Sequence, residues 1–364
     1  MATSIKVNNI GNRDAFPTRR IIVEFFDTPE AQTIDTEYAK NKVVKSGVPE
    51  LEPIIVYPDE QHIIINDTSN NVDIRVRLSR NYGGIDPRAT VSICNLSEKI
   101  INELTTVEFA PKYSKTIRVF AGYETKGNET SSIPLLFSGT ILWALPTTGR
   151  PDVWFTIQAV ENFYNVNTIL KLPQGIAKDF EYSYEFVKYV CSDIGGYPQS
   201  AIDTSFFDKI KSSAQPNRLK EYLLNNRDTY SFSSTLGDFL KKDVFQWGRM
   251  SAVQMSDKLI LLPCSADMDF IESGEDKSTL PIISASSTPT MIGIPKPNPT
   301  GIDFTTLFDT DVLLPMKRFT LKSYIFPKFD DFVYWVQKVD YDLQLRGQNF
   351  YNHVVARRKV QRKE

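Results

Sequence analysis

Few residues in this sequence have the types and the spacing that catalysis requires. The chain contains two histidines, His62 and His353, and each falls in a short apolar run that is typical of a strand. Two histidines this far apart exclude a His-Glu-x-x-His zinc helix, and neither a G-x-x-x-x-G-K-[ST] phosphate loop nor a G-x-S-x-G nucleophile elbow is present. The stretch that begins at Gly274 lacks the first glycine of a phosphate loop, so we interpret it as a surface linker.

Paired carboxylates are the arrangement that comes nearest to a catalytic site. Acid–base hydrolysis of a glycan needs two carboxyl groups at a controlled separation, with different pKa values. Acidic residues are also ordinary in solvated turns and at strand ends, and we favour that interpretation for Asp330/Asp331, Asp340/Asp342 and Asp267/Asp269. The sequence therefore predicts no enzyme, with no catalytic, cofactor-binding or metal-binding residue and no cofactor.

Cysteine usage and charge exclude further classes of protein. Cys94, Cys191 and Cys264 are odd in number and far apart, so neither a disulfide framework nor a Cys-rich zinc site is expected, and a reducing cytoplasm fits the folding environment. The net charge is −2, and non-specific DNA binding needs clustered cations. The basic run at the C-terminus is expected to be a solvated tail, with a contact to an acidic partner as the alternative: Arg357, Arg358, Lys359, Arg362 and Lys363.

Length and patterning indicate a β-rich protein with more than one domain. The 364 residues, of which 41% are apolar, suggest two or three domains with sizeable cores. No stretch approaches ~20 apolar residues, and the N-terminus has no apolar core of signal-peptide length, so neither a membrane span nor a signal peptide is expected. The 23 Phe and 16 Tyr, with frequent Pro and Gly, favour strands and turns.

The clearest strand is 72–79, where apolar residues alternate with Asp73, Arg75, Arg77 and Ser79. Alternation of this kind gives a strand with one buried and one wet face, so both arginines lie on the same side. That side is either a solvated outer face, or a subunit interface or lumen wall on which the arginines pair with Asp73 of a neighbouring copy.

The remaining patterns divide the chain into four parts. We expect an N-terminal arm (1–50) with a strand at 19–27 and a possible short helix at 37–45, and a first β domain (51–165) with a helix that Ser97 caps. A mixed α+β middle domain (166–279) has helices at 184–194, at 217–225 and after Ser233, and a second β domain (280–364) ends in the basic tail. Further strands are expected at 54–57, 62–66, 91–94, 116–122, 135–145, 153–160, 258–262, 281–285, 301–308, 317–322, 332–339 and 350–356.

The order of several short motifs resembles the tube-like domains of phage baseplate hub proteins. The first domain is similar at 91–97 (VSICNLS), in the "AGY" strand 117–123 and in the "F-x-G-x-I" strand 136–141. A strand that ends at Glu161 follows these motifs. The resemblance continues over 235–262 and in the "IG-x-P" stretch 291–295 with 300–308, and ends at the "RG" turn 345–351. It covers roughly residues 70–358.

This resemblance implies an α+β, predominantly β fold in which two tube-like antiparallel β-barrel domains, with a short helix, flank the middle domain. It implies a homotrimeric ring in a contractile tail, located in the virion baseplate and assembled in the host cytoplasm. The implied partners are the tail tube or a tube-initiator protein, the central spike, wedge proteins and the tape measure protein, with DNA passing through the lumen. A glycan-binding or peptidoglycan-hydrolysing tail module is the alternative. Residues 1–50 have no counterpart in the family, and clasping a neighbouring subunit or wedge protein is our hypothesis for them.

Overall fold

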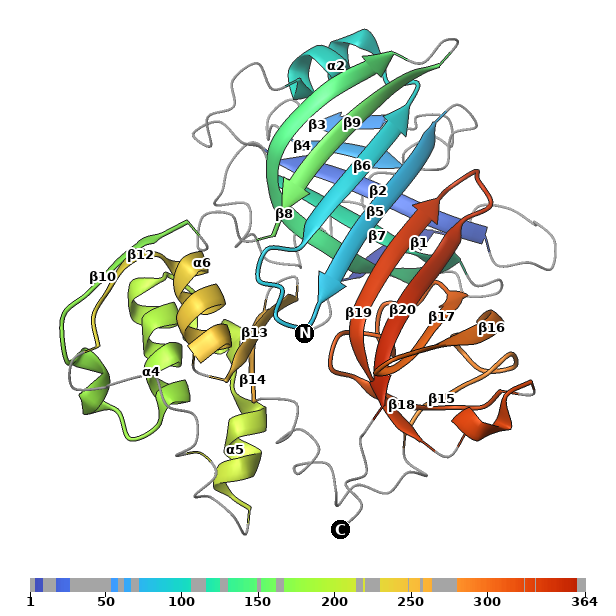
Figure 1. The fold of residues 1–364 in the computed structure, drawn as a ribbon. Coiled ribbons are helices and arrows are strands. Elements are labelled where there is room, and N and C mark those ends of the chain that lie inside the picture. The colour runs from blue at the N-terminus through green and yellow to red at the C-terminus, as the bar shows by residue number, and fades with distance from the viewer. Residues whose placement is uncertain are drawn as a thin grey trace.

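The fold is taken from a computed structural model of the chain. It describes residues 4–8, 18–26, 54–57, 62–66, 72–105, 116–124, 130–148, 152–161, 167–213, 219, 230–247, 249–255, 258–263, 280–323, 325–330 and 332–358. Fifteen strands of the described part form one large sheet, and two small sheets belong to a segment beside it (Figure 1).

Two runs of five strands account for most of the large sheet. The first repeat consists of β5 (Asp73–Asn81), β6 (Arg88–Cys94), β7 (Thr116–Glu124), β8 (Thr130–Thr148) and β9 (Val153–Val160). The second repeat consists of β16 (Met291–Asn298), β17 (Gly301–Leu307), β18 (Arg318–Leu321), β19 (Val333–Gln344) and β20 (Phe350–Arg358).

Both repeats have the same topology. In each, the first strand pairs with the second, the second with the fifth, the fifth with the fourth, and the fourth with the third, all antiparallel. In the first repeat α2 (Glu98–Leu104) stands between the second and third strands, whereas residues 308–317 stand there in the second. The fold class is confirmed as predominantly β, and the two predicted β domains are two copies of one strand arrangement.

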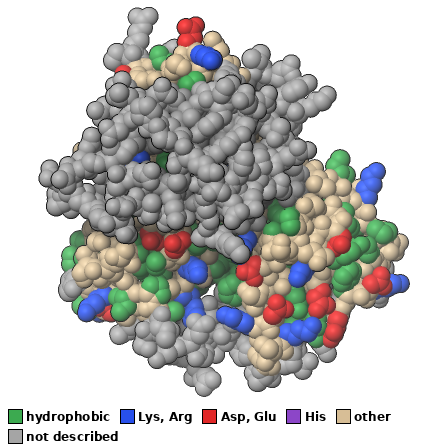
Figure 2. All heavy atoms as spheres, turned by 180° about the vertical axis from the view of Figure 1, so that it is seen from behind, with side chains coloured by type: hydrophobic (Ala, Val, Ile, Leu, Met, Phe, Trp, Pro, Cys, Tyr) green, Lys and Arg blue, Asp and Glu red, His purple; other side chains and the backbone are tan. Residues whose placement is uncertain are grey.

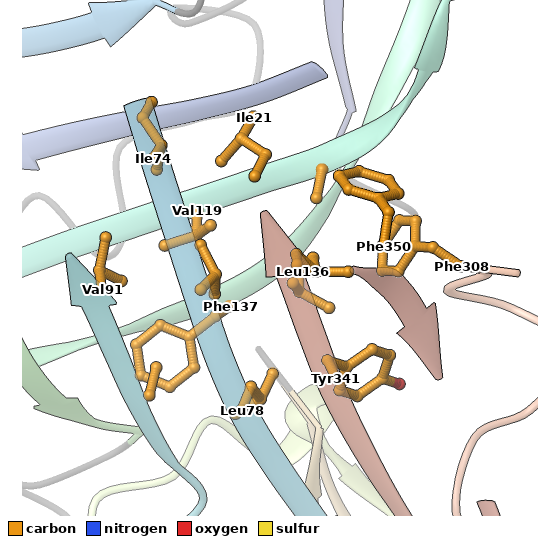
Figure 3. Packing of buried hydrophobic residues seen from close by; sticks show 14 of the residues in the cluster. Ile21, Ile74, Leu78, Val91, Val119, Leu136, Phe137, Phe308, Tyr341 and Phe350 are labelled. Atoms are coloured by element: carbon orange, nitrogen blue, oxygen red, sulfur yellow. The ribbon is translucent and has the colours of Figure 1, made fainter. Parts of the chain in front are cut away.

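The two repeats are joined by pairing of β5 with β19, which lie side by side in Figure 1. The junction runs from Lys338 opposite Asn81 to Gln344 opposite Arg75. One hydrophobic core continues across it and contains Leu78 of β5, Tyr341 of β19 and Phe350 of β20 (Figure 3). The β domains therefore share a sheet and a core, which sequence patterns alone did not indicate.

Residues before the first repeat extend this sheet. β2 (Thr18–Phe26) pairs with β7 on one side and with β4 (His62–Asn66) on the other, and β3 (Ile54–Tyr57) pairs with β4. β1 (Ser4–Asn8) pairs with β8. Ile21, Val23 and Phe25 are buried in the shared core because they occupy alternate positions of β2.

The predicted N-terminal arm therefore contributes a strand to the core. Removing residues 1–50 would remove β2 from the core, so a loss of assembly would report unfolding as well as a lost contact. Residues 1–17 are the part whose removal spares β2. The domain boundaries and the clasping role stay predictions, and the possible helix at 37–45 lies outside the described residues.

The middle segment has a core of its own. Its elements are β10 (Ile169–Leu172), η3 (Ile176–Asp179), α4 (Ser183–Tyr189), η4 (Val190–Ile194), η5 (Gln199–Ala201), β11 (Ile202–Asp203), α5 (Ser205–Lys211), β12 (Phe232–Thr235), α6 (Leu236–Asp238), η7 (Phe239–Trp247), β13 (Ser251–Met255) and β14 (Lys258–Leu262). It meets the repeats where Val253 and Leu262 pack with Trp335, and where the Tyr82 hydroxyl donates to the carbonyl of Pro263 over 3.1 Å. The second repeat is completed by β15 (Ile282–Ile283), parallel to β18, and by the turn η9 (Pro327–Phe329).

The predicted helices are confirmed where the structure describes them. The helix predicted at 184–194 is α4 continued by η4, and it ends before Gly196, whose φ of 76° suits glycine. The helix after Ser233 is α6 continued by η7, and Thr235 caps it by accepting a bond from the Asp238 amide. Ser97 stands at the cap of α2, but its side chain makes no capping bond. The helix predicted at 217–225 lies outside the described residues apart from Leu219.

A buried ion pair lies where the three parts of the chain meet. Nη2 of Arg80 on β5 is 2.6 Å from Oε1 of Glu161, which follows β9, and the two side chains are 4% and 0% exposed. The same nitrogen donates to the carbonyl of Leu136 on β8 over 2.7 Å. Burial raises the pKa of Tyr341 on β19 to about 12, although the charge of Arg80 opposes this. Burial also raises the pKa of Tyr197 in the middle segment, and the nearby Cys191 and Glu161 raise it further.

Glu161→Gln should lower the free energy of unfolding by about 3–5 kcal/mol, because it leaves the Arg80 charge buried without its counter-ion. Urea denaturation followed by tryptophan fluorescence measures the change. Lys241→Gln is the matched control, since it breaks an ion pair with Asp86 in which the lysine side chain is 49% exposed, and it should have little effect. Equal losses in the two variants would contradict a structural role for the buried pair.

Glu24 of β2 predicts a pH dependence of stability. Its side chain is fully buried opposite Arg118 of β7, and burial raises its pKa to about 7, against the opposing charge of Arg118. Between these pKa values the folded state keeps a proton that the unfolded state has released. The free energy of unfolding therefore falls as the pH rises from about 4.5 to about 7, and it levels off above pH 7. The fall should amount to about 3 kcal/mol.

Glu24→Gln should remove this slope because the amide does not titrate. Urea midpoints measured between about pH 5 and pH 8 test it. Glu98→Gln, on the exposed first turn of α2, is the control and should keep the slope. The same slope in the Glu24 variant would refute the assignment.

Candidate assembly surface

The outer face of eight consecutive strands is a described surface to which both repeats contribute. Their hydrogen-bonded order is β16-β17-β20-β19-β5-β6-β9-β8, so the face crosses both repeats without a break. Strand alternation sends apolar residues into the shared core and polar ones outward. The outward residues of the central strands are Asp73, Arg75, Arg77, Ser79, Arg88, Thr90, Ser92, Lys338, Asp340, Asp342 and Gln344.

Cations on this face have carboxylates beside them. Nζ of Lys338 is 2.7 Å from Asp340, and Nε of Arg77 on β5 is 3.8 Å from Asp342 on β19, across the junction between the repeats. Nη2 of Arg88 is 3.9 Å from Asp86. Charges of both signs also lie interspersed in the described part of the opposite side of the molecule (Figure 2). The central strands of the eight-strand face are thus polar without a field of one sign.

The predicted arginine pair is on one exposed side, as the alternation indicated. Nε of Arg75 is 3.4 Å from Asp73 of the same chain, and its guanidinium lies 4.0 Å from the ring centroid of Trp154 on β9. Asp73 also accepts a bond from the Arg346 amide over 3.2 Å. Within one chain Asp73 therefore already has partners.

The carboxylate pairs make structural contacts where they are described. Asp330 accepts a bond from the Ser323 amide over 2.7 Å, which fixes the turn that contains η9. Asp342 accepts from the Asn349 amide group over 2.7 Å in addition to facing Arg77. Asp331 and the pair Asp267/Asp269 lie outside the described residues. Asp340 and Asp342, the pair whose members are both described, are partly exposed on the outer face and lie beside Lys338 and Arg77.

Both histidine positions are in strands, as predicted. His353 lies exposed on β20 with Nδ1 3.2 Å from the Thr305 hydroxyl, and His62 begins β4. Cys94 and Cys191 are buried thiols, and burial raises the pKa of both, so neither is a ready nucleophile. Cys264 and the 274–279 linker lie outside the described residues.

The start of the basic C-terminal run is not a solvated tail. Arg357 and Arg358 belong to β20, where Arg357 donates to the Gln337 side chain over 3.0 Å and Arg358 lies 4.5 Å from the ring centroid of Phe332. The prediction was wrong there because the strand that begins at Phe350 continues through the first two residues of the basic cluster. Lys359, Arg362 and Lys363 lie outside the described residues.

Two kinds of feature are absent from the described part of the chain. No group of three or more His, Cys, Asp and Glu side chains there is arranged to hold a metal ion. None of its helices combines the length and apolar character needed to cross a bilayer.

Sequence reasoning missed one edge of this surface, the strand β16. Its residues MIGIPKPN show no regular alternation, because the register with β17 shifts between Ile292 and Lys296 and because prolines interrupt it. The available signal was the position of this stretch directly before the hairpin to β17.

Comparison with solved structures finds distant likenesses. A tail protein from Neisseria meningitidis MC58 aligns with a TM-score of 0.45 at 8% identity, over 79% of this chain and 96% of that one. The E. coli c3393 protein, a type VI secretion component with similarity to the T4 tail proteins gp27 and gp5, aligns with a TM-score of 0.44 at 7% identity, over 80% and 74%. A Francisella PdpA–VgrG complex gives a TM-score of 0.46 at 8% identity, over 94% and 58%.

A search of curated protein sequences found no match. The family described as baseplate hub gp41 matches residues 54–218 and 275–356, which include both five-strand repeats except the last two residues of β20. This match covers more than half of the sequence and leaves out only short parts of the described sheet. The chain therefore belongs to the baseplate hub gp41 family of phage tail proteins.

Proposed function

We propose that this protein is the structural hub of a contractile-tail baseplate, acting as a homotrimeric ring between the hexameric tail tube and the trimeric central spike. It acts in the virion tail and assembles in the host cytoplasm. The repeat of one five-strand topology within one chain is the observation that carries the proposal. Three copies of a chain with two such repeats offer six similar positions to a six-fold tube, while keeping three-fold symmetry toward a spike.

The eight-strand polar face is the wall of the lumen in this proposal. It is the one described surface to which both repeats contribute continuous strands, so a ring of subunits would present it as a closed lining. The carboxylates beside Arg75, Arg77 and Lys338 offset the charges that would otherwise hold phosphates. DNA would pass this wall without sequence readout and without strong retention.

The remaining partners follow from this position in the tail. The tail tube or a tube initiator would dock on one side of the ring and the spike on the other, with wedge and tape measure proteins as further neighbours. We propose no enzymatic role. The alternative of a peptidoglycan-hydrolysing module is disfavoured by the structural contacts of Asp330 and Asp342, and a zymogram of the purified chain tests it. No described observation favours the glycan-binding alternative.

Light scattering coupled to size exclusion should give three copies of the 41.5 kDa chain, either in the protein alone or in its complex with the spike protein after the mass of the spike is subtracted. A ring of three copies is expected because exposed sheet edges favour pairing with another copy. A stable monomer or dimer in both samples would overturn the trimeric hub.

Replacing the paired carboxylates should turn the polar face into a DNA-binding surface. The triple variant Asp73→Asn, Asp340→Asn and Asp342→Asn releases about three cations, so log K should fall with log salt at a slope of about −2.7. Affinity for duplex DNA should then rise about 40-fold between 200 and 50 mM salt, whereas the unaltered protein should show little binding. Fluorescence anisotropy with a labelled duplex measures both.

The control for this variant changes net charge by the same amount at carboxylates away from the face. Asp179→Asn, Asp193→Asn and Asp311→Asn are exposed in the middle segment or in the loop after β17. If this control bound DNA as well as the face variant does, net charge alone would explain the effect and the self-neutralised face would be refuted.

A further inference from the structure

The connection between the third and fourth strands differs between the two repeats. In the first repeat it joins β7 to β8 through residues 125–129 (TKGNE), which include no apolar residue. In the second repeat it joins β18 to β19 through residues 322–332, which contain η9 and the apolar pair Ile325 and Phe326. The strands on either side correspond, so the longer apolar connection is a feature that one repeat has and the other lacks.

Three large apolar side chains are exposed at this connection. Ile325 and Phe326 are 58% and 44% exposed, and Ile282 of β15 is 55% exposed. Ile282 lies beside the start of the connection because β15 pairs with β18, as Figure 1 shows, and because the Lys322 amide donates to the Ile283 carbonyl over 2.9 Å. The apolar knob is defined as the side chains of Ile282, Ile325 and Phe326. Exposed apolar side chains that gather in this way are typical of a contact site.

Hydrogen bonds hold the turn that carries the knob in one conformation. The buried Ser323 donates through its amide to Asp330 over 2.7 Å, and its hydroxyl oxygen accepts from the Phe326 amide over 3.2 Å. The Phe329 amide donates to the Phe326 carbonyl over 3.0 Å, and the Phe329 carbonyl accepts from the Tyr334 hydroxyl over 3.2 Å. A turn held in this way loses little conformational entropy on binding, so its exposed side chains can act as anchors.

The surroundings of the knob are basic, although the whole chain has a net charge of −2. Residues 317–332 include four cations and two carboxylates, and Lys322 and Lys328, on either side of Ile325 and Phe326 in sequence, are both exposed. Arg358 at the end of β20 adds a further cation, 4.5 Å from the ring centroid of Phe332. The partner surface that complements this end of the second repeat is an apolar pocket with carboxylates at its rim.

The number of knobs in a ring indicates which partner they serve. A ring of three copies has six repeats but three knobs, so a six-fold tube would meet a knob at every second position, whereas a three-fold spike meets all three in the same way. The middle segment, which is also present once per chain, packs on Trp335 near the start of β19. Both features that distinguish the repeats thus lie at the same end of β19.

We propose that the apolar knob docks in an apolar pocket of the trimeric spike protein, one knob for each spike subunit, with Lys322 and Lys328 facing carboxylates at the rim of the pocket. The inference rests on the hub function proposed above. It adds the surface of the second repeat through which the hub holds the spike.

Binding of the full chain to the immobilised spike protein of the same phage, measured by biolayer interferometry, tests the knob. Ile325→Ser with Phe326→Ser should weaken this binding by at least about 30-fold, because two rigidly held anchors are lost. The control is Ile169→Ser with Val153→Ser, which removes side chains that are 70% and 44% exposed elsewhere, and it should bind as the unaltered chain does.

A second pair of variants tests the charges. Lys322→Glu with Lys328→Glu should weaken spike binding about tenfold at about 50 mM salt, and the loss should shrink at about 500 mM because exposed charges are screened. Lys99→Glu with Lys258→Glu makes the same change in net charge at exposed positions of α2 and β14, and it should have little effect. Because these side chains are exposed, the charge variants keep the test open if the serine variant is poorly folded.

The possible results separate this proposal from the hub proposal. Undiminished spike binding by the serine and charge variants, in a chain that forms trimers, would overturn the knob and leave the hub standing. Weaker binding to the tail tube protein, with spike binding intact, would overturn the choice of partner. Binding to vesicles of phosphatidylglycerol and phosphatidylcholine that depends on Ile325 and Phe326, with spike binding intact, would replace the spike with a lipid surface. A chain that stays monomeric with and without the spike counts against both proposals.

Discussion

Pairing of β5 with β19 is the contact on which the rest of the structure depends. These strands are far apart in sequence, so bringing them together costs loop-closure entropy that local contacts cannot offset. The offset comes from the core that continues beneath the junction. Arg80, which lies opposite Val339 of β19, is bonded to Glu161 and to the carbonyl of Leu136. A buried pair of this kind is costly to break, and so it favours one register over its slipped alternatives.

That junction determines what the surface can be. Because β5 and β19 are neighbours, the outward faces of the two repeats merge into one polar sheet, and charges such as Arg77 and Asp342 meet across it. The eight-strand face is therefore organised by a single intrachain pairing, which makes one continuous surface of two repeats.

Local patterns predicted the elements better than they predicted their relations. Alternation located β5, and the Gly195–Gly196 pair marked the end of the helix that begins at Ser183, because both signals arise within a few residues. β16 was missed because a bulge and prolines interrupt its alternation. α5 was missed because its seven residues are too few to show a clear helical period. The shared core and the Arg80–Glu161 pair could not be predicted, because they depend on which distant strands become neighbours. No local period shows that β16 repeats the position of β5.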